Sequence, residues 1–220
     1  MKTVVAIHTA MTMVEPTKAL FAENIPNVRL INIADDSLIQ DVIKAGEVPE
    51  HVRKRLLSYY NAAVDAGADV IFNTCSSVGD VAIEGRAQVS VPLVKIDDAM
   101  AEKAVRNYKR IGVLATLPNT LDPTARLVQS FSNELNKPVE IEKGLAIGAF
   151  QKLMDGDVEG HNQKILETAL ALAGKVDVFV LAQGSMAKIQ DEIIKLTGKD
   201  VLSSPLLGTL QVKSVLESFK

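Results

Sequence analysis

Cys75 is the only cysteine of this 220-residue chain and the side chain best suited to chemistry. It follows the apolar run at residues 69–73 and opens a turn rich in serine and glycine. A polar turn after a strand exposes side chains at the rim of a sheet, and a helix that begins near Ser77 would favour the thiolate through its free N–H groups. A thiolate there can take up or return a proton. We therefore expect Cys75 to be catalytic, and the side chains around it to bind substrate: Asn73, Thr74, Ser76 and Ser77.

His8 is the second candidate for proton transfer. It ends the first apolar run, and the pKa of an imidazole lies near neutrality. Short hydroxyl and amide side chains follow two of the apolar runs and can hold a carboxylate through neutral hydrogen bonds, although they also suit turns. We expect these residues to bind substrate: Thr9, Thr116, Asn119 and Thr120.

Short apolar runs alternate with longer amphipathic segments along the whole chain. The runs predict strands at residues 3–7, 28–33, 70–73, 91–96, 111–115, 139–145 and 176–182. The amphipathic segments predict helices at residues 15–23, 49–66, 99–107, 121–135, 161–173, 187–196 and 207–218. Unalternating β-branched runs are typical of strands covered on both faces, so the pattern predicts an α/β fold with parallel sheets.

The chain also contains an internal sequence repeat. Residues 46–51 (GEVPEH) match residues 156–161 (GDVEGH), and residues 4–9 match residues 111–116. We interpret this as an internal duplication that produces two pseudo-symmetric lobes, each a parallel sheet flanked by helices. The predicted domains are residues 1–98, with the helix at 205–220 packing back on them, and residues 99–204. Ligands of such folds bind beyond the carboxyl ends of strands, which predicts an active-site cleft between the lobes.

Composition narrows the possible partners. The net charge is −3, aromatic residues make up 4% and tryptophan is absent, which argues against nucleic acid or an anionic membrane as the main partner. A single cysteine excludes an intrachain disulfide and a cysteine-cluster metal site, and no glycine-rich nucleotide motif is present. The N-terminus does not have the pattern of a targeting segment. We expect a cytoplasmic protein that acts on a small molecule without a cofactor or metal, and assembly into a homo-oligomer stays open.

Several motifs together resemble the aspartate/glutamate/hydantoin racemase superfamily. The first is Asn73-Thr74-Cys75 after a strand of a duplicated α/β chain of this length. The others are LAT at 114–116 followed by Thr120, VPL at 91–93 before IDDA at 96–99, GAF at 148–150 before Gly156-Asp157, and VLAQGSM at 180–186. The resemblance spans nearly the whole chain.

The resemblance implies a cofactor-independent isomerase. In this superfamily two cysteines, one per lobe, move a proton on a carbon next to a carboxylate or carbonyl, while N–H groups and hydroxyls hold the carboxylate. It implies that Cys75 is the first of these cysteines and that Thr116 and Thr120 bind the carboxylate. The place of the second cysteine is taken by Gln183, followed by Gly184 and Ser185, and we expect this turn to bind substrate.

Glutamine cannot exchange a proton near neutral pH, so symmetric two-cysteine racemisation is not supported. Four alternatives remain open. His8 or Asp98 could replace the missing acid, or the chemistry could be a one-sided isomerisation. Cys75 could instead protonate a carbanion during decarboxylation of a malonate-like acid. Finally, the protein could bind a small molecule without catalysis.

Overall fold

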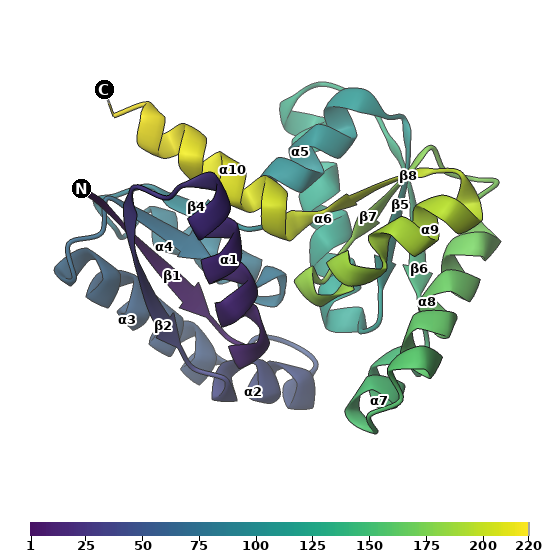
Figure 1. Ribbon diagram of the computed structural model, residues 1–220, viewed down its shortest axis with the longest axis horizontal. Coiled ribbons are helices and arrows are strands. Elements are labelled where there is room, and N and C mark those ends of the chain that lie inside the picture. Colours follow the sequence, from purple (N-terminus) through teal and green to yellow (C-terminus); the bar gives the residue numbers. More distant parts are fainter. Residues whose placement is uncertain (220) are drawn as a thin grey trace. The chain divides into compact units, whose positions relative to one another are not determined.

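The structure is a computed structural model that describes residues 1–219. The chain separates into two compact units: unit 1 contains Met1–Ile96 together with the segment that starts at Pro205, and unit 2 contains Asp97–Ser204. Each unit has its own four-stranded sheet (Figure 1). Across the described residues, the helices are too short or too polar to cross a membrane.

Unit 1 has a parallel sheet with the strand order β2-β1-β3-β4. Its strands are β1 (Lys2–His8), β2 (Val28–Ala34), β3 (Val70–Asn73) and β4 (Leu93–Lys95). The two central strands, β1 and β3, are almost entirely buried. Because they are parallel neighbours, the segments that follow them emerge at the same edge of the sheet.

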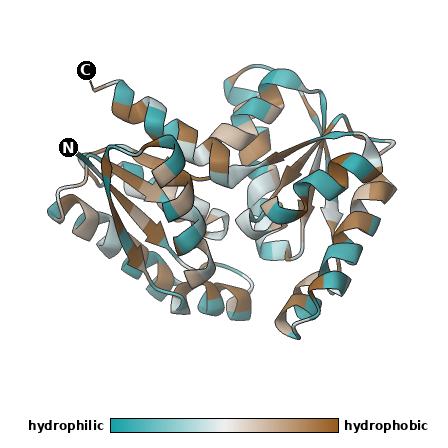
Figure 2. Ribbon diagram, viewed as in Figure 1, coloured by the Kyte–Doolittle hydropathy of each residue, from teal (hydrophilic) through white to brown (hydrophobic). Residues whose placement is uncertain are grey.

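Helices cover both faces of this sheet. They are α1 (Val14–Asn24), α2 (Ser37–Ala45), α3 (Glu50–Asp65), α4 (Gly79–Arg86) and α10 (Ser204–Glu217). Val5 and Ile71 pack against α2, α3 and α4 on one face, whereas Val4 and Phe72 pack with α1 and α10 on the other. Successive strand residues point to opposite faces, so strands covered on both sides must be apolar throughout. Figure 2 shows this as mainly brown strands between helices banded in teal and brown.

The C-terminal helix α10 approaches the end of β4 closely. A Cβ atom on Gly208 would lie 2.5 Å from the carbonyl oxygen of Ile96, which is closer than real Cβ contacts allow. Glycine is therefore required at this point for α10 to pack in unit 1.

Unit 2 has a parallel sheet with the order β6-β5-β7-β8. Its strands are β5 (Arg110–Ala115), β6 (Glu140–Leu145), β7 (Val178–Leu181) and β8 (Asp200–Ser203). Its helices are α5 (Asp98–Asn107), α6 (Pro118–Glu134), α7 (Ala149–Met154), α8 (Val158–Leu172) and α9 (Gln190–Thr197). Ile165 of α8 and Ile193 of α9 pack with Leu114, Phe179 and Val201 of the sheet.

The two units share more than their strand order. The carboxylate of Asp69, just before β3, accepts a hydrogen bond from the backbone N–H of Thr3 at 2.7 Å and pairs with Lys2. In unit 2, Asp177 precedes β7, accepts from the backbone N–H of Arg110 at 3.0 Å and pairs with its guanidinium. The same contact thus ties together the central strands of each sheet, as expected if the chain arose by duplication.

The predicted α/β class with two parallel sheets is confirmed. Among the α-helices and strands, α2, α7 and β8 were not predicted, whereas the helix considered near Ser77 is present as the 3-10 helix Ser76–Val78 and α4. Helices α2 and α7 have nine residues or fewer, so each offers little more than two turns of periodicity. Strand β8 has only four residues and begins and ends on polar ones, which hides it from a search for apolar runs.

Candidate functional site

Cys75 lies just beyond the carboxyl end of β3. Its backbone is extended, with φ −128° and ψ 117°, and it directly precedes a short 3-10 helix, Ser76–Val78, that continues into α4. The side chain is partly buried. The thiol therefore stands where a central strand turns into a helix, and the first backbone N–H groups after the turn lie beside the sulfur.

Burial raises the pKa of the Cys75 thiol above its usual value, and several donors act against this effect. They are the Thr9 hydroxyl, the backbone N–H groups of Ser77 and Val78, and the Ser77 hydroxyl. Thr9 is 1% exposed, and its hydroxyl has no hydrogen-bond partner among the described residues. The thiol is thus protonated at rest, but donors are in place to stabilise the thiolate when it forms.

Two residues outside the turn hold the backbone of Cys75. The Tyr60 hydroxyl of α3 donates to Asn73 Oδ1 at 3.0 Å, and Asn73 Nδ2 donates to the Cys75 carbonyl at 2.9 Å. Burial and the neighbouring thiolate both raise the pKa of Tyr60, so its hydroxyl remains a donor at neutral pH. Asn73 uses both of its polar side-chain atoms within unit 1. Asn73 was predicted from the sequence, but the hydrogen bond from the Tyr60 hydroxyl to Asn73 was not. In the sequence, Tyr60 is recognisable only as a residue on the apolar face of a helix.

His8 is fully buried at the end of β1, and both of its ring nitrogens are engaged. Nε2 lies 2.8 Å from Asn32 Oδ1 and Nδ1 lies 2.9 Å from the Thr74 hydroxyl. The Thr74 hydroxyl oxygen is also 3.0 Å from the Ile7 carbonyl oxygen, so its one proton is shared between two acceptors when the imidazole is neutral. Burial lowers the pKa of His8, against a smaller effect of the Asn32 hydrogen bond. The imidazole is therefore neutral at pH 7 and links β1, β2 and the turn before Cys75.

Unit 2 repeats this geometry with a different side chain. Gln183 follows β7, as Cys75 follows β3, with φ −125° and ψ 131°, and it precedes the 3-10 helix Gly184–Ile189. Its Oε1 accepts hydrogen bonds from the backbone N–H of Thr116 at 2.7 Å and from the Thr116 hydroxyl at 3.0 Å. Thr116 follows β5 as Thr9 follows β1. A threonine thus stands beside the residue after the third strand in each unit.

The remaining predicted residues of unit 2 lie around this pair. The Thr120 hydroxyl donates to the Leu117 carbonyl in the first turn of α6, and Asn119 Oδ1 is buried without a partner among the described residues. Ser185 is exposed in the turn after Gln183. Thr116, Asn119, Thr120 and Gln183 therefore gather where β5 and β7 end, whereas His8, Thr9 and Cys75 gather where β1 and β3 end.

One buried lysine at the end of the unit 1 sheet was not predicted. Lys95 ends β4 beside Asn73 of β3 and is 2% exposed. Its ammonium nitrogen lies 3.1 Å from the position that a Cβ atom on Gly79 would occupy, at the start of α4. A larger residue than glycine at position 79 would displace the lysine. Lys95 cannot be recognised as buried from its sequence context, because a lysine in a strand is usually exposed.

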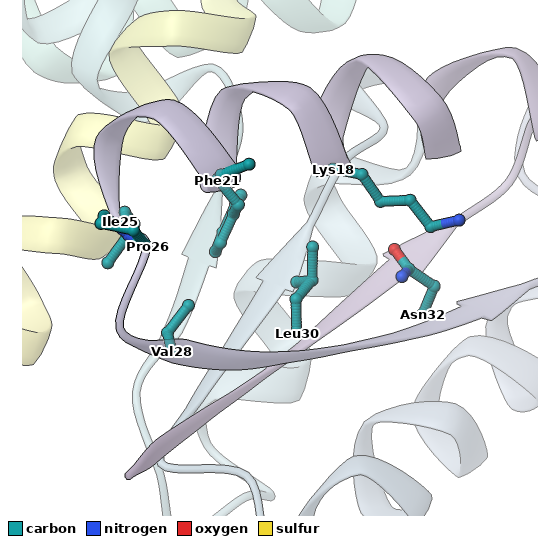
Figure 3. A pocket seen from close by; sticks show the side chains of 8 residues that line it. Lys18, Phe21, Ile25, Pro26, Val28, Leu30 and Asn32 are labelled. Carbon is teal, nitrogen blue, oxygen red and sulfur yellow. The ribbon is translucent and has the colours of Figure 1, made fainter.

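A pocket of about 270 Å³ lies elsewhere in unit 1, between α1 and the edge strand β2 (Figure 3). It is lined by Lys18, Phe21, Ala22, Ile25, Pro26, Val28, Leu30 and Asn32. It contains none of the predicted site residues and meets the His8 network only through Asn32. Among residues 1–219, no group of three or more His, Cys, Asp or Glu side chains is placed to hold a metal ion.

Comparison with known proteins gives a consistent picture. Crystal structures of similar fold include glutamate racemase from Francisella tularensis subsp. tularensis SCHU S4 in complex with D-glutamate, with a TM-score of 0.76, 15% identity, and coverage of 99% of this chain and 82% of that one. Allantoin racemase from Klebsiella pneumoniae has a TM-score of 0.73 and 15% identity, with coverage of 100% and 89%.

A glycine-to-cysteine mutant of arylmalonate decarboxylase also shares the fold, with a TM-score of 0.62, 15% identity, and coverage of 99% and 94%. A search of curated protein sequences found no match. The family model for Asp/Glu/hydantoin racemase matches residues 3–211. Because that match spans almost the entire chain, the protein belongs to the Asp/Glu/hydantoin racemase family.

Proposed function

We propose that this protein is a cofactor-independent isomerase that moves a proton on a carbon next to a carboxylate or carbonyl of a small polar acid, with Cys75 as the acid and base. The observation that carries the proposal is the surroundings of the thiol. The buried Thr9 hydroxyl has no hydrogen-bond partner among the described residues, and this hydroxyl together with the backbone N–H groups of Ser77 and Val78 favours the thiolate of Cys75. Such an arrangement serves a sulfur that alternates between thiol and thiolate.

The proton transfer follows from these contacts. The thiol first loses its proton to solvent. The thiolate then removes the proton from the substrate carbon, and the electron pair of the C–H bond moves into the adjacent carboxyl or carbonyl group to give an enolate. The new thiol gives its proton to the enolate oxygen, which converts the carbonyl form of the substrate to its enol, whereas return of the proton to the same face of the carbon regenerates the substrate and is seen only as hydrogen exchange. Because burial raises the pKa of Cys75, its thiolate is a stronger base than an ordinary cysteine thiolate, which suits a weakly acidic C–H bond.

The other residues have supporting roles in this proposal. Neutral hydroxyl, amide and backbone donors would hold the substrate oxygens: Ser76, Ser77, Asn119, Gln183, Gly184 and Ser185. Thr116 and Thr120 would support this group indirectly, because the Thr116 donors bond to Gln183 and the Thr120 hydroxyl bonds to the Leu117 carbonyl. Asn73 would fix the backbone of Cys75. His8, buried and neutral, would act through Thr74 as a positioning residue, because both of its nitrogens are already bonded.

The test is hydrogen exchange in D2O, followed by proton NMR. Both enantiomers of glutamate and aspartate, together with allantoin, are incubated with the wild type and with Cys75→Ser. We expect at least one acid to lose its carbon-bound proton to solvent, and the variant to slow this by about 100-fold or more. Ser132→Ala, which removes a buried hydroxyl bonded to the Lys137 carbonyl, serves as a control for loss of a buried polar group. Equal exchange by wild type and Cys75→Ser would contradict the proposal.

Decarboxylation is the second candidate, and Gln183 favours it. An amide in the place of a second acid and base leaves one proton donor, which is sufficient to protonate the carbanion left when a malonate-like acid loses carbon dioxide. Carbon dioxide release from phenylmalonate, absent in Cys75→Ser, would select this reaction over isomerisation.

A further inference from the structure

The orientation of the Gln183 side-chain amide is fixed by chemistry. The backbone N–H of Thr116 can only donate, so the Gln183 atom 2.7 Å away must be the oxygen. The Thr116 hydroxyl lies 3.0 Å from the same atom and donates to it as well. With Oε1 held by two donors from one residue, Nε2 must point away from β5.

The two N–H groups of Gln183 Nε2 have no acceptor among residues 1–219. Other glutamines of the chain use theirs differently: the amide nitrogens of Gln88, Gln129, Gln151 and Gln163 each donate to a side chain four residues away in the sequence. Those four bonds are local and exposed, whereas Gln183 is partly buried at the end of a central strand. Among the glutamines of residues 1–219, Gln183 alone combines an oxygen that accepts from two donors with an amide nitrogen that has no acceptor.

Gln183 occupies the position in unit 2 that Cys75 occupies in unit 1, and this equivalence indicates what the amide donor does. Cys75 and Gln183 have nearly the same backbone conformation, directly before a 3-10 helix and beside the threonine that follows the first strand of their unit. In unit 1 that threonine supports a group that can lose a proton, and in unit 2 it holds a group that cannot.

We propose that Gln183 is a substrate-binding residue whose Nε2 donates to a carboxylate or enolate oxygen, and that proton transfer is confined to Cys75. This inference rests on the proposed function and makes it more specific. The substrate must carry an oxygen acceptor for Gln183, and one face of its carbon exchanges a proton with the enzyme. The hydrogen bond strengthens as negative charge develops on the enolate oxygen, so Gln183 stabilises the intermediate without taking part in acid–base chemistry.

The test uses the full-length protein and three probes: malonate, D-glutamate and L-aspartate. Side-chain amide signals in ¹H–¹⁵N spectra report directly on the donor. We expect the Gln183 amide signals, identified by their loss in Gln183→Met, to move on titration with at least one probe. The amide signals of Gln190, whose Oε1 likewise accepts from a hydroxyl at 2.7 Å, that of Ser203, provide the internal control and should stay in place.

Affinity gives the second measurement. A hydrogen bond to a charged acceptor implies that Gln183→Met weakens binding of that probe by about 10- to 100-fold, whereas Gln190→Met leaves it unchanged. Gln183→Glu keeps an oxygen for Thr116 but presents a negative charge in place of the donor, so it should bind the probe more weakly still.

The two proposals can fail separately. If no acid exchanges its proton but the Gln183 signals move and Gln183→Met loses affinity, the isomerase proposal fails and the assignment of Gln183 stands. If Cys75-dependent exchange is found and Gln183→Met leaves KM and kcat unchanged, the assignment of Gln183 is overturned. Failure of all three probes to move the Gln183 amide signals of the wild type would also overturn it.

Discussion

Replacing Tyr60 by phenylalanine tests how the turn that carries Cys75 is held. Tyr60 is fully buried, and its hydroxyl is the only donor to Asn73 Oδ1 within the described residues. The substitution removes that donor and keeps the aromatic ring, so packing against α4 should be preserved. The amide of Asn73, which holds the Cys75 carbonyl, is left with a buried oxygen and no partner.

The expected cost follows from that unpaired oxygen. A buried acceptor that loses its only donor destabilises a protein by about 1–3 kcal/mol, which includes the desolvation that the hydrogen bond had offset. The cavity left by one hydroxyl oxygen is small, because the aromatic ring stays in place, so it adds little to the loss in free energy of unfolding. We therefore expect Tyr60→Phe to lower the free energy of unfolding by about 1–3 kcal/mol.

Urea unfolding followed by circular dichroism measures this change, and Tyr59→Phe on the same helix is the matched control. The Tyr59 hydroxyl donates to Asp35 at 2.6 Å, but that carboxylate keeps the Ser37 hydroxyl and the Arg55 guanidinium when the tyrosine is lost. Tyr59→Phe should therefore cost less than about 1 kcal/mol. Equal losses in the two variants would refute the idea that the unpaired Asn73 oxygen determines the cost.

Three further predictions concern the same unit. Thr9→Val should raise the pKa of Cys75 further, because it removes a donor to the thiolate, and so slow alkylation by iodoacetamide at neutral pH. The unfolding free energy should fall as the pH drops below 6.5, because burial lowers the pKa of His8 and only the unfolded state then takes up its proton; His8→Gln should reduce this dependence in urea titrations at several pH values. Gly85→Ala should destabilise unit 1 by about 1–3 kcal/mol in the same assay, because the new Cβ would lie 2.6 Å from the ring of Tyr60.

Each of these predictions has a result that would count against it. For the thiol, Thr74→Val is the control, because its hydroxyl bonds to Ile7 and His8 instead of the sulfur; equal slowing in both variants would remove the special role of Thr9. An unchanged pH dependence in His8→Gln would mean that other groups cause it. A neutral Gly85→Ala would show that the ring of Tyr60 can move aside.

The sequence predicted most of the fold because both sheets are buried on two sides. Runs such as residues 70–73 and 111–115 have no polar face, and that pattern identifies parallel strands without knowledge of their neighbours. The edge strand β8 gave no such signal, since its burial comes from β7 and α9 instead of from its own composition. The cleft expected between the lobes stays a prediction.

The residues of the candidate site could be chosen from the sequence, but the hydrogen bonds between them could not. Cys75 and Gln183 could be picked out because each follows an apolar run, and residues at strand ends gather at one edge of a parallel sheet. The contacts of Tyr60 with Asn73 and of His8 with Asn32 join different elements, so their pairing depends on how those elements pack. Gln183 and Thr116 were both expected to bind substrate, and only the structure shows that one orients the other.

The two units show how a repeated scaffold can carry unequal chemistry. Strand order, the carboxylates before β3 and β7, and the threonines after β1 and β5 are the same in both, so the position after the third strand has the same backbone and a similar neighbour. A side chain at that position therefore meets nearby hydrogen-bond donors whatever its type. A thiol there gains support for its anion, whereas a glutamine has its oxygen held and its nitrogen turned outward. The same geometry that brings donors to the thiol in unit 1 thus holds the glutamine oxygen in unit 2. In our proposal this single side-chain difference separates proton transfer from recognition of charge.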